Sequence, residues 1–265
     1  MDSDALPFER DLDIHYLILQ TKDFVVFLDK ELDVDWKTTD AYDARQEGDS
    51  LSRNKIKNRM ASLECIPNDH LRTNIRRNYK RMLGEGLARS FNHDYENAMS
   101  ILDDAEQYIR ARNIEAARYW QLSTSCLSGI FCGLAACLIW AFRIQIIPIL
   151  GETGLYVVLA GLAGGLGALI SIIFRMGNAQ ITTDAERKLH MLEAISRIMG
   201  GVISGLIISI FVKLGLFVPV FQKANEASLA MVAAGLVAGA SERWVPSLIA
   251  QFENGQKVPK PKGGK

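Results

Sequence analysis

The residues of this 265-residue chain best suited to chemistry are basic ones, gathered between positions 51 and 90. That segment has 10 lysines and arginines against 3 acidic residues. Arg72, Arg76 and Lys80 recur every four residues, so they are expected to share one helix face. Arginine offers paired donors to phosphate oxygens, so such a face suits a phosphate-rich ligand. The candidate ligand-binding residues are Arg53, Lys57, Arg72, Arg76, Arg77, Lys80 and Arg81.

Three interpretations of this basic segment remain open. Its side chains could neutralise the acidic stretch 29–49 of the same domain, since residues 1–50 carry 14 acidic against 5 basic residues. They could contact anionic lipid headgroups at the inner leaflet. They could bind a nucleotide or an oligonucleotide. The net charge of the chain is zero, which excludes a uniformly basic nucleic-acid-binding protein.

Sequence motifs of common enzyme classes are absent. There is no GxxxxGKS/T phosphate loop, no HExxH zinc motif and no GxSxG nucleophile elbow. The four histidines follow no metal-ligand spacing, and the four cysteines match neither a zinc site nor a disulfide framework. The sequence therefore predicts a protein that is not an enzyme and that uses neither a metal nor a cofactor.

Four long apolar stretches occupy the second half of the chain. No charged residue lies between Arg118 and Arg143, an interval longer than the roughly 20 residues that cross a bilayer core. A buried helix of a soluble domain would retain a polar stripe, so we predict membrane spans. The other three stretches lie between Glu152 and Arg175, from Arg197 to about Phe221, and from Ala227 to about Ile249.

Each predicted span contains one pair of glycines four residues apart. Glycines at this spacing allow two helix backbones to approach closely in lipid. The pairs are Gly129 and Gly133, Gly161 and Gly165, Gly201 and Gly205, and Gly235 and Gly239. Their presence in every span predicts a tightly packed bundle, within one protomer or between protomers.

Glu242 is an acidic residue inside the fourth predicted span. Counted from Ser228, it lies about 21 Å along a helix, in the inner part of the membrane. An unpaired carboxylate there costs about 2.5–3.5 kcal/mol on insertion scales. Arg175 ends the second span and Arg197 begins the third, so we expect Glu242 to pair with one of them and fasten the inner bundle ends. The alternative is that Glu242 reaches the headgroup water.

Basic residues near the span ends predict the orientation, because they accumulate on the cytoplasmic side. They cluster before the first span, between the second and third, and after the fourth, so both termini are expected in the cytoplasm. The predicted fold class is all-α, a four-helix transmembrane bundle with an N-terminal helical cytoplasmic domain. Its parts are a cytoplasmic domain (1–93), a connecting helix (94–121), the four-span domain (122–250) and a basic tail (251–265).

Helices are predicted for most of the segments that precede or link the spans. In the cytoplasmic domain they are expected over residues 8–31, 52–64 and 69–84, the last ending near Gly84 and Gly86. Residues 36–52 are expected to form a loop, and Phe24–Leu28 also has the composition of a strand.

Two further helices are expected closer to the membrane. One long helix is expected from about Asp94 to Phe142, because no glycine or proline separates the connecting helix from the first span. A short amphipathic helix opened by Thr183 and Glu186 is expected between the second and third spans.

Three segments resemble a bacterial group of small four-span membrane proteins with a helical cytoplasmic leader. They are Tyr95–Trp120 (YENAMSILDDAEQYIRARNIEAARYW), Gly164–Arg175 (GGLGALISIIFR) and Gly239–Ile249 (GASERWVPSLI). The last is the most specific, with its Ser-Glu-Arg-Trp-Val-Pro run at the end of the fourth span. The resemblance covers about residues 94–250 and implies the topology above, in a bacterial inner membrane.

The whole plan is also similar to membrane effectors of bacterial antiphage defence systems, and nearest to Hailong-type effectors. In those proteins a cytoplasmic domain senses a nucleotide signal and the spans permeabilise the membrane. The Hailong effector is a tetrameric channel held shut by a DNA oligomer. The resemblance implies a homo-oligomer, with a tetramer as the expected state, whose ligand is a DNA oligomer or a cyclic nucleotide made by a partner nucleotidyltransferase. It assigns no ligand-binding residue.

Together these features predict an oligomeric membrane channel or membrane-disrupting effector for antiphage defence. It is gated by a nucleotide or oligonucleotide ligand at its cytoplasmic domain. A non-conducting membrane scaffold that recruits a cytoplasmic partner is the alternative. A transporter is disfavoured, because acidic residues are absent near the bilayer midplane, where coupling ions usually bind.

Overall fold

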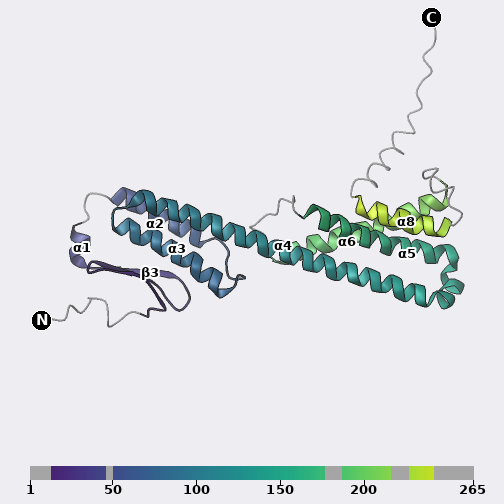
Figure 1. Ribbon diagram of the computed structural model, residues 1–265, viewed down its shortest axis with the longest axis horizontal. Helices are drawn as coiled ribbons and strands as arrows, with labels where there is room; N and C mark the ends of the chain where they lie inside the picture. Colours follow the sequence, from purple (N-terminus) through teal and green to yellow (C-terminus); the bar gives the residue numbers. More distant parts are fainter. Residues whose placement is uncertain (1–12, 46–49, 177–186, 216–226, 242–265) are drawn as a thin grey trace, which may run out of the picture. The chain divides into compact units, whose positions relative to one another are not determined.

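A computed structural model of the chain describes residues 13–45, 50–176, 187–215 and 227–241. These residues are mostly helical, as predicted, and they also contain a three-stranded sheet that the all-α expectation did not include (Figure 1). The chain divides into two compact units, one reaching to Ala116 and the other beginning at Ala117.

The sheet of the first unit consists of β1 (Tyr16–Gln20), β2 (Phe24–Leu28) and β3 (Val34–Thr38), paired antiparallel in that order. All five residues of the central strand β2 are buried, so this strand is a continuous apolar run instead of an alternating one. The helix predicted over residues 8–31 is therefore wrong in its described part, and the strand-like composition of β2 indicated the correct structure.

Four helices contribute to the first unit: α1 (Asp40–Ala44), α2 (Ser50–Glu64), α3 (Thr73–Phe91) and the beginning of α4 (Tyr95–Ala141). The loop predicted over 36–52 thus contains the end of β3, all of α1 and the start of α2. The predicted end of the second basic helix near Gly84 and Gly86 is also wrong, because α3 continues to Phe91.

Close packing, not helix termination, explains the two glycines of α3. A Cβ at Gly86 would lie 2.9 Å from Leu102 Cδ2, and one at Gly84 would overlap Ile18. The core around them is formed by β2 and by apolar residues of three helices: Ile56, Met60 and Leu63 of α2, Tyr79, Leu83 and Leu87 of α3, and Ala98, Leu102, Ala105 and Ile109 of α4.

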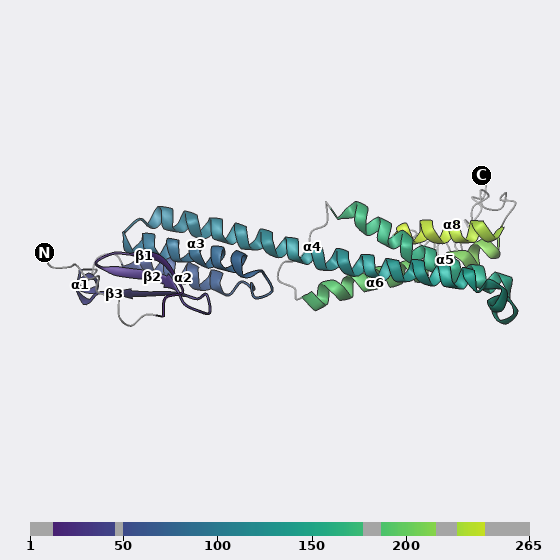
Figure 2. The same ribbon diagram turned by 60° about the horizontal axis from the view of Figure 1, so that its bottom comes forward.

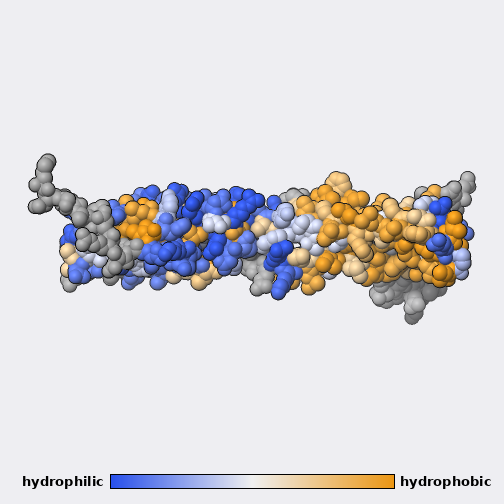
Figure 3. Space-filling view, turned by 90° about the horizontal axis from the view of Figure 1, so that it is seen from below, coloured by the Kyte–Doolittle hydropathy of each residue, from blue (hydrophilic) through white to orange (hydrophobic). Residues whose placement is uncertain are grey.

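The long helix predicted from about Asp94 to Phe142 is confirmed as α4, which runs unbroken for 47 residues. The second unit adds α5 (Arg143–Arg175), α6 (Arg187–Lys213) and α8 (Ala227–Ala240). Three helices, α4, α5 and α6, are long and apolar enough to cross a membrane, whereas α8 has 14 residues in the described part. Figure 3 shows the apolar residues concentrated over the helices of this unit. The chain is thus compatible with a multi-pass membrane protein.

Two details differ from the expected spans. α5 begins at Arg143 and changes direction at Gly151, whose φ is 74°, so the second predicted span corresponds to the part after this kink. The separate amphipathic helix expected between the second and third spans is not separate: from Arg187 onward it is the first part of α6. Thr183 and Glu186 lie outside the described residues.

Glycines bring α5, α6 and α8 into backbone contact within one protomer. The carbonyl of Gly164 on α5 lies so close to Gly201 and Gly239 that a Cβ at either would overlap it. Gly205 and Gly235 lie in the same way against the backbone of Ala160. Figure 2 shows α6 and α8 beside α5. The remaining predicted pairs meet side chains: Gly129 meets Leu169, Gly133 meets Leu166, Gly161 meets Leu206, and Gly165 meets Cys132 and Val202.

Candidate functional site

The basic row of α3 lies on the same side of the helix as its buried residues. Tyr79, Leu83 and Leu87, all 0% exposed, define the buried face of α3. At 100° per residue, Arg76 and Lys80 fall on or beside that face. Arg77 and Arg81 fall on the opposite side and are exposed. The basic residues that the sequence suggested for α3 are therefore divided between the buried side of the helix and its outer side.

Lys80 is a buried cation with two acidic partners. Only 6% of its side chain is exposed, and Nζ lies 2.9 Å from Asp33 Oδ1 and 3.3 Å from Glu64 Oε1. A buried ammonium group needs such partners, because desolvation strongly disfavours an unpaired charge. Asp33 belongs to the acidic stretch 29–49. Lys80 therefore acts as an internal counter-charge, as expected if the basic segment neutralises the acidic stretch of the same domain.

Arg76 is also engaged within the first unit. Its guanidinium lies 3.1 Å from Asp69 Oδ1, and its Nε donates to Asn68 Oδ1 at 3.2 Å. The Asn68 amide in turn donates to the carbonyl of Ile66 at 2.9 Å. Arg76 therefore fastens the loop between α2 and α3.

Lys57 of α2 lies against aromatic rings. Its ammonium nitrogen is 5.2 Å from the ring centre of Trp36 and 5.8 Å from that of Phe91. Burial lowers the pKa of Lys57, and the neighbouring Arg53 lowers it further. The rings hold the charge by cation–π attraction, so Lys57 helps to close the core beside β3.

Arg59 joins α2 to α4, and it was not among the predicted site residues. It donates to Asp103 Oδ1 at 2.8 Å and also to Glu106, which accepts from Arg110 Nε at 2.8 Å. The hydrogen bond from Arg110 is the main cause that lowers the pKa of Glu106, and the one from Arg59 adds to it. The Glu106 and Arg110 pair has the i,i+4 spacing that sequence can show; the contribution of Arg59 needs the fold.

Four of the seven predicted ligand-binding residues remain at or near the surface: Arg53, Arg72, Arg77 and Arg81. Arg77 and Arg81 share the outer side of α3 with Asn74 and Asn78, which are exposed as well. Arg81 Nε is 3.7 Å from Glu85 Oε1, a loose pair that leaves the guanidinium accessible. This exposed strip of α3, defined by Asn74, Arg77, Asn78 and Arg81, can offer amide and guanidinium donors to phosphate oxygens.

A polar cavity of about 350 Å³ lies elsewhere in the first unit. Its cationic groups are Lys22 and Arg45, and Arg45 is 2.6 Å from Asp23 Oδ1. Sequence spacing gave no signal for this cavity, because its residues come from a predicted helix, a predicted loop and the segment between two predicted helices. They are Thr21, Lys22, Asp23, Phe24, Tyr42, Arg45, Phe91, Asn92 and His93.

The predicted pairing of Glu242 stays a prediction, since Glu242 lies outside the described residues. Of its two expected partners, Arg175 ends α5, and Arg197 on α6 has an ion pair with Glu193 at 2.9 Å.

Among the described residues no group of three histidines, cysteines or carboxylates is arranged to hold a metal ion. Comparison with family models, curated proteins and solved structures gives no match.

Proposed function

We propose that this chain is a multi-pass protein of the bacterial inner membrane that forms a ligand-gated channel or a membrane-disrupting effector. In this proposal four spans cross the bilayer, both termini are cytoplasmic, and copies of the chain assemble into a homo-oligomer, with a tetramer as the expected state. The N-terminal unit senses a nucleotide or oligonucleotide ligand. The biological role is antiphage defence, with no enzymatic activity of the chain itself.

The observation that carries this proposal is that α4 belongs to both units. Ala98, Leu102, Ala105 and Ile109 place its first part in the core of the first unit. Farther along, Gly129 meets Leu169 of α5 in the apolar unit. A ligand that moves α3 against α4 would therefore act on the helix that becomes the first span. Unbroken helices transmit such shifts, because packed helix interfaces shift between discrete arrangements.

The exposed strip of α3 supports a phosphate-rich ligand. In an oligomer, strips from several protomers would add their fields, and a DNA oligomer or a cyclic nucleotide made by a partner nucleotidyltransferase would neutralise several at once. Arg72, at the start of α3, and Arg53 on α2 extend the set. Lys57, Arg76 and Lys80 leave it, because they hold the domain together.

A non-conducting scaffold is the second candidate, and one observation favours it. Three of the seven predicted ligand-binding cations are held by close contacts within the first unit, and Arg81 is loosely paired with Glu85, which leaves less charge for a polyanion. A scaffold would use the exposed surface of the first unit to recruit a cytoplasmic partner. The two candidates differ in whether the membrane conducts.

Binding of a fluorescent single-stranded oligodeoxynucleotide to the purified full chain tests the ligand half of the proposal. The Arg77→Glu/Arg81→Glu variant is expected to lose binding, and wild-type affinity is expected to fall steeply with salt, because phosphate contacts release counterions. Lys37→Glu/Lys55→Glu is the matched control, since it changes the net charge equally at exposed lysines outside the strip. Equal affinity of both variants would contradict the assignment of the strip.

A further inference from the structure

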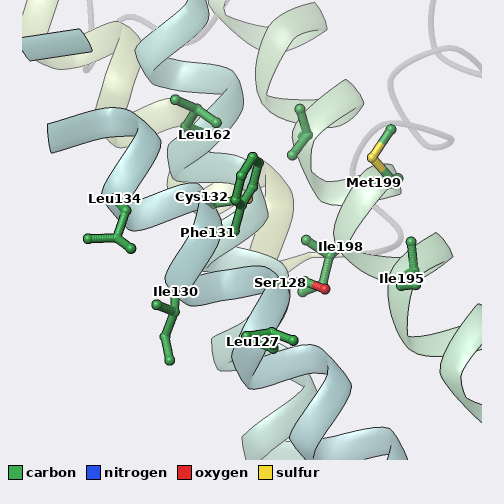
Figure 4. A pocket seen from close by; sticks show the side chains of 11 residues that line it. Leu127, Ser128, Ile130, Phe131, Cys132, Leu134, Leu162, Ile195, Ile198 and Met199 are labelled. Atoms are coloured by element: carbon green, nitrogen blue, oxygen red, sulfur yellow. The ribbon is translucent and has the colours of Figure 1, made fainter. Parts of the chain in front are cut away.

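The second unit contains an apolar cavity of about 640 Å³ between α4, α5 and α6. Its lining is apolar apart from Ser128 and comprises Leu127, Ser128, Ile130, Phe131, Cys132 and Leu134 of α4, Leu162 of α5, and Ile195, Ile198, Met199 and Val202 of α6. Figure 4 shows the labelled residues of α4 at the left and below, those of α6 at the right, and Leu162 at the upper end. Leu127 and Phe131 are 70% and 72% exposed, so the cavity is an open groove.

A smaller and more polar cavity of about 190 Å³ follows the groove towards the beginning of α6. The two cavities share Leu127. On α6, Arg187 lies eight residues before the groove-lining Ile195, about 12 Å along the helix. The residues that line the smaller cavity are Trp120, Ser123, Thr124, Leu127, Arg187 and Met191.

Along these two helices a polar, positively charged region is followed by an apolar one, which is the order of headgroup and acyl chain in a phospholipid. A guanidinium and hydroxyl groups come first, beside a tryptophan of the kind that favours the membrane–water interface. The apolar groove follows in the same direction along both helices, because residue numbers rise on α4 and on α6 from the polar cavity to the apolar one. Arg187 supplies the positive charge that complements an anionic phosphate.

We propose that this α4–α6 groove binds one anionic phospholipid per protomer. One acyl chain occupies the apolar cavity, and Arg187 holds the headgroup phosphate beside Trp120 and Thr124. The proposal rests on the membrane location proposed above, and it requires neither conduction nor a nucleotide ligand. Binding at this groove would hold the beginning of the first span against the beginning of α6.

Native mass spectrometry of the detergent-purified full chain, incubated with either phosphatidylglycerol or phosphatidylcholine, tests the site. The wild type is expected to retain one phosphatidylglycerol per protomer at collision energies that remove phosphatidylcholine. Arg187→Gln is expected to weaken phosphatidylglycerol retention about fivefold, the contribution of one basic side chain near an anionic lipid. Lys188→Gln is the matched control, because it removes the neighbouring charge, which lines neither cavity.

A groove-filling variant tests the acyl-chain half. Met199→Trp is expected to lower retention of the lipid, whereas Ile203→Trp, an equally exposed residue of α6 that lines neither cavity, is expected to leave it unchanged. Retention that is equal in Arg187→Gln and Lys188→Gln, and equal in the two tryptophan variants, would overturn the site. If lipid is retained as expected and reconstituted vesicles conduct no ions, the lipid site stands and the channel proposal fails.

Discussion

Lys80 Nζ donates a hydrogen bond to Asp33 Oδ1 across 2.9 Å, from a side chain that is only 6% exposed. This contact ties α3 to the turn between β2 and β3, and Glu64 adds a tie to the end of α2 at 3.3 Å. A cation in this position stabilises the first unit and cannot reach a ligand without leaving its partners. The ligand-binding surface therefore has to be sought on the other side of α3.

Removing the partners of Lys80 should destabilise the first unit more than removing Lys80 itself. The Asp33→Asn/Glu64→Gln variant leaves the buried ammonium without a carboxylate partner, and we expect it to lose about 2–3 kcal/mol of unfolding free energy. Lys80→Met keeps the packing and should lose about 1 kcal/mol or less. Hydrogen exchange of α3 peptides in the full chain measures both, with the exposed Asp35→Asn as control. A larger loss in Lys80→Met than in the double variant would contradict the counter-charge role.

The stability of the first unit should decrease in mild acid because of Glu106. Hydrogen bonds from Arg110 and Arg59 lower the pKa of Glu106 in the folded chain below its ordinary value of 4.5. A lowered pKa contributes stability that is fully present above 4.5 and is lost as the pH falls through the folded value. Unfolding measured between pH 6 and about pH 3 should show a shallower decline for Glu106→Gln than for the wild type. Identical slopes would show that this carboxylate does not contribute.

The effect of a glycine-to-alanine substitution on the stability of the second unit should depend on the position of the glycine. Gly239→Ala places a methyl group against the backbone of Gly164, so α8 and α5 must separate, at a cost of about 1–3 kcal/mol or more. Gly200→Ala meets nothing within 4 Å and should be neutral or stabilising by up to about 1 kcal/mol, because alanine favours helix. Thermal unfolding in detergent micelles distinguishes the two. Equal effects would mean that the seam between these helices is not tight.

Much of the helical architecture could be predicted from the sequence, whereas only the central strand of the sheet was indicated, as an alternative to a helix. The length of α4 was predicted from an uninterrupted helical pattern, and the apolar helices were predicted from the absence of charged residues. The sequence did not decide the structure of β2, because a central strand buried on both sides shows no alternation of apolar and polar residues. Phe24–Leu28 therefore has the pattern of a buried helix as much as that of a strand. Its partners β1 and β3 are recognisable only once β2 is known to be a strand.

The candidate site was only partly predictable for a related reason. Helical spacing placed Arg76 and Lys80 on one face, but spacing alone does not say whether a face is buried. The signal that could have found it is the coincidence of Lys80 with Tyr79, Leu83 and Leu87, whose shared face must be the core face. The partners Asp33 and Asp69 come from loops, and the polar cavity around Arg45 joins three separate segments, so neither has a sequence signature.

Cysteine accessibility should report the proposed orientation. Cys65 is exposed in the first unit, and the other cysteines, Cys126, Cys132 and Cys137, lie in the apolar part of α4. In a variant that keeps Cys65 alone, a membrane-permeant maleimide should label intact cells and an impermeant one should label them only after lysis. Labelling of intact cells by the impermeant reagent would place the first unit outside the cytoplasm.

Ion flux through vesicles reconstituted with the purified full chain tests the central claim most directly. We expect the wild type to release a trapped ion, and a single-stranded oligodeoxynucleotide on the cytoplasmic side to change that rate. The resemblance to a DNA-restrained effector favours a decrease. Arg77→Glu/Arg81→Glu should conduct without responding to the oligonucleotide, and Lys37→Glu/Lys55→Glu should respond like the wild type. Vesicles that stay sealed with wild-type protein, with and without the oligonucleotide, would contradict the channel and favour the scaffold.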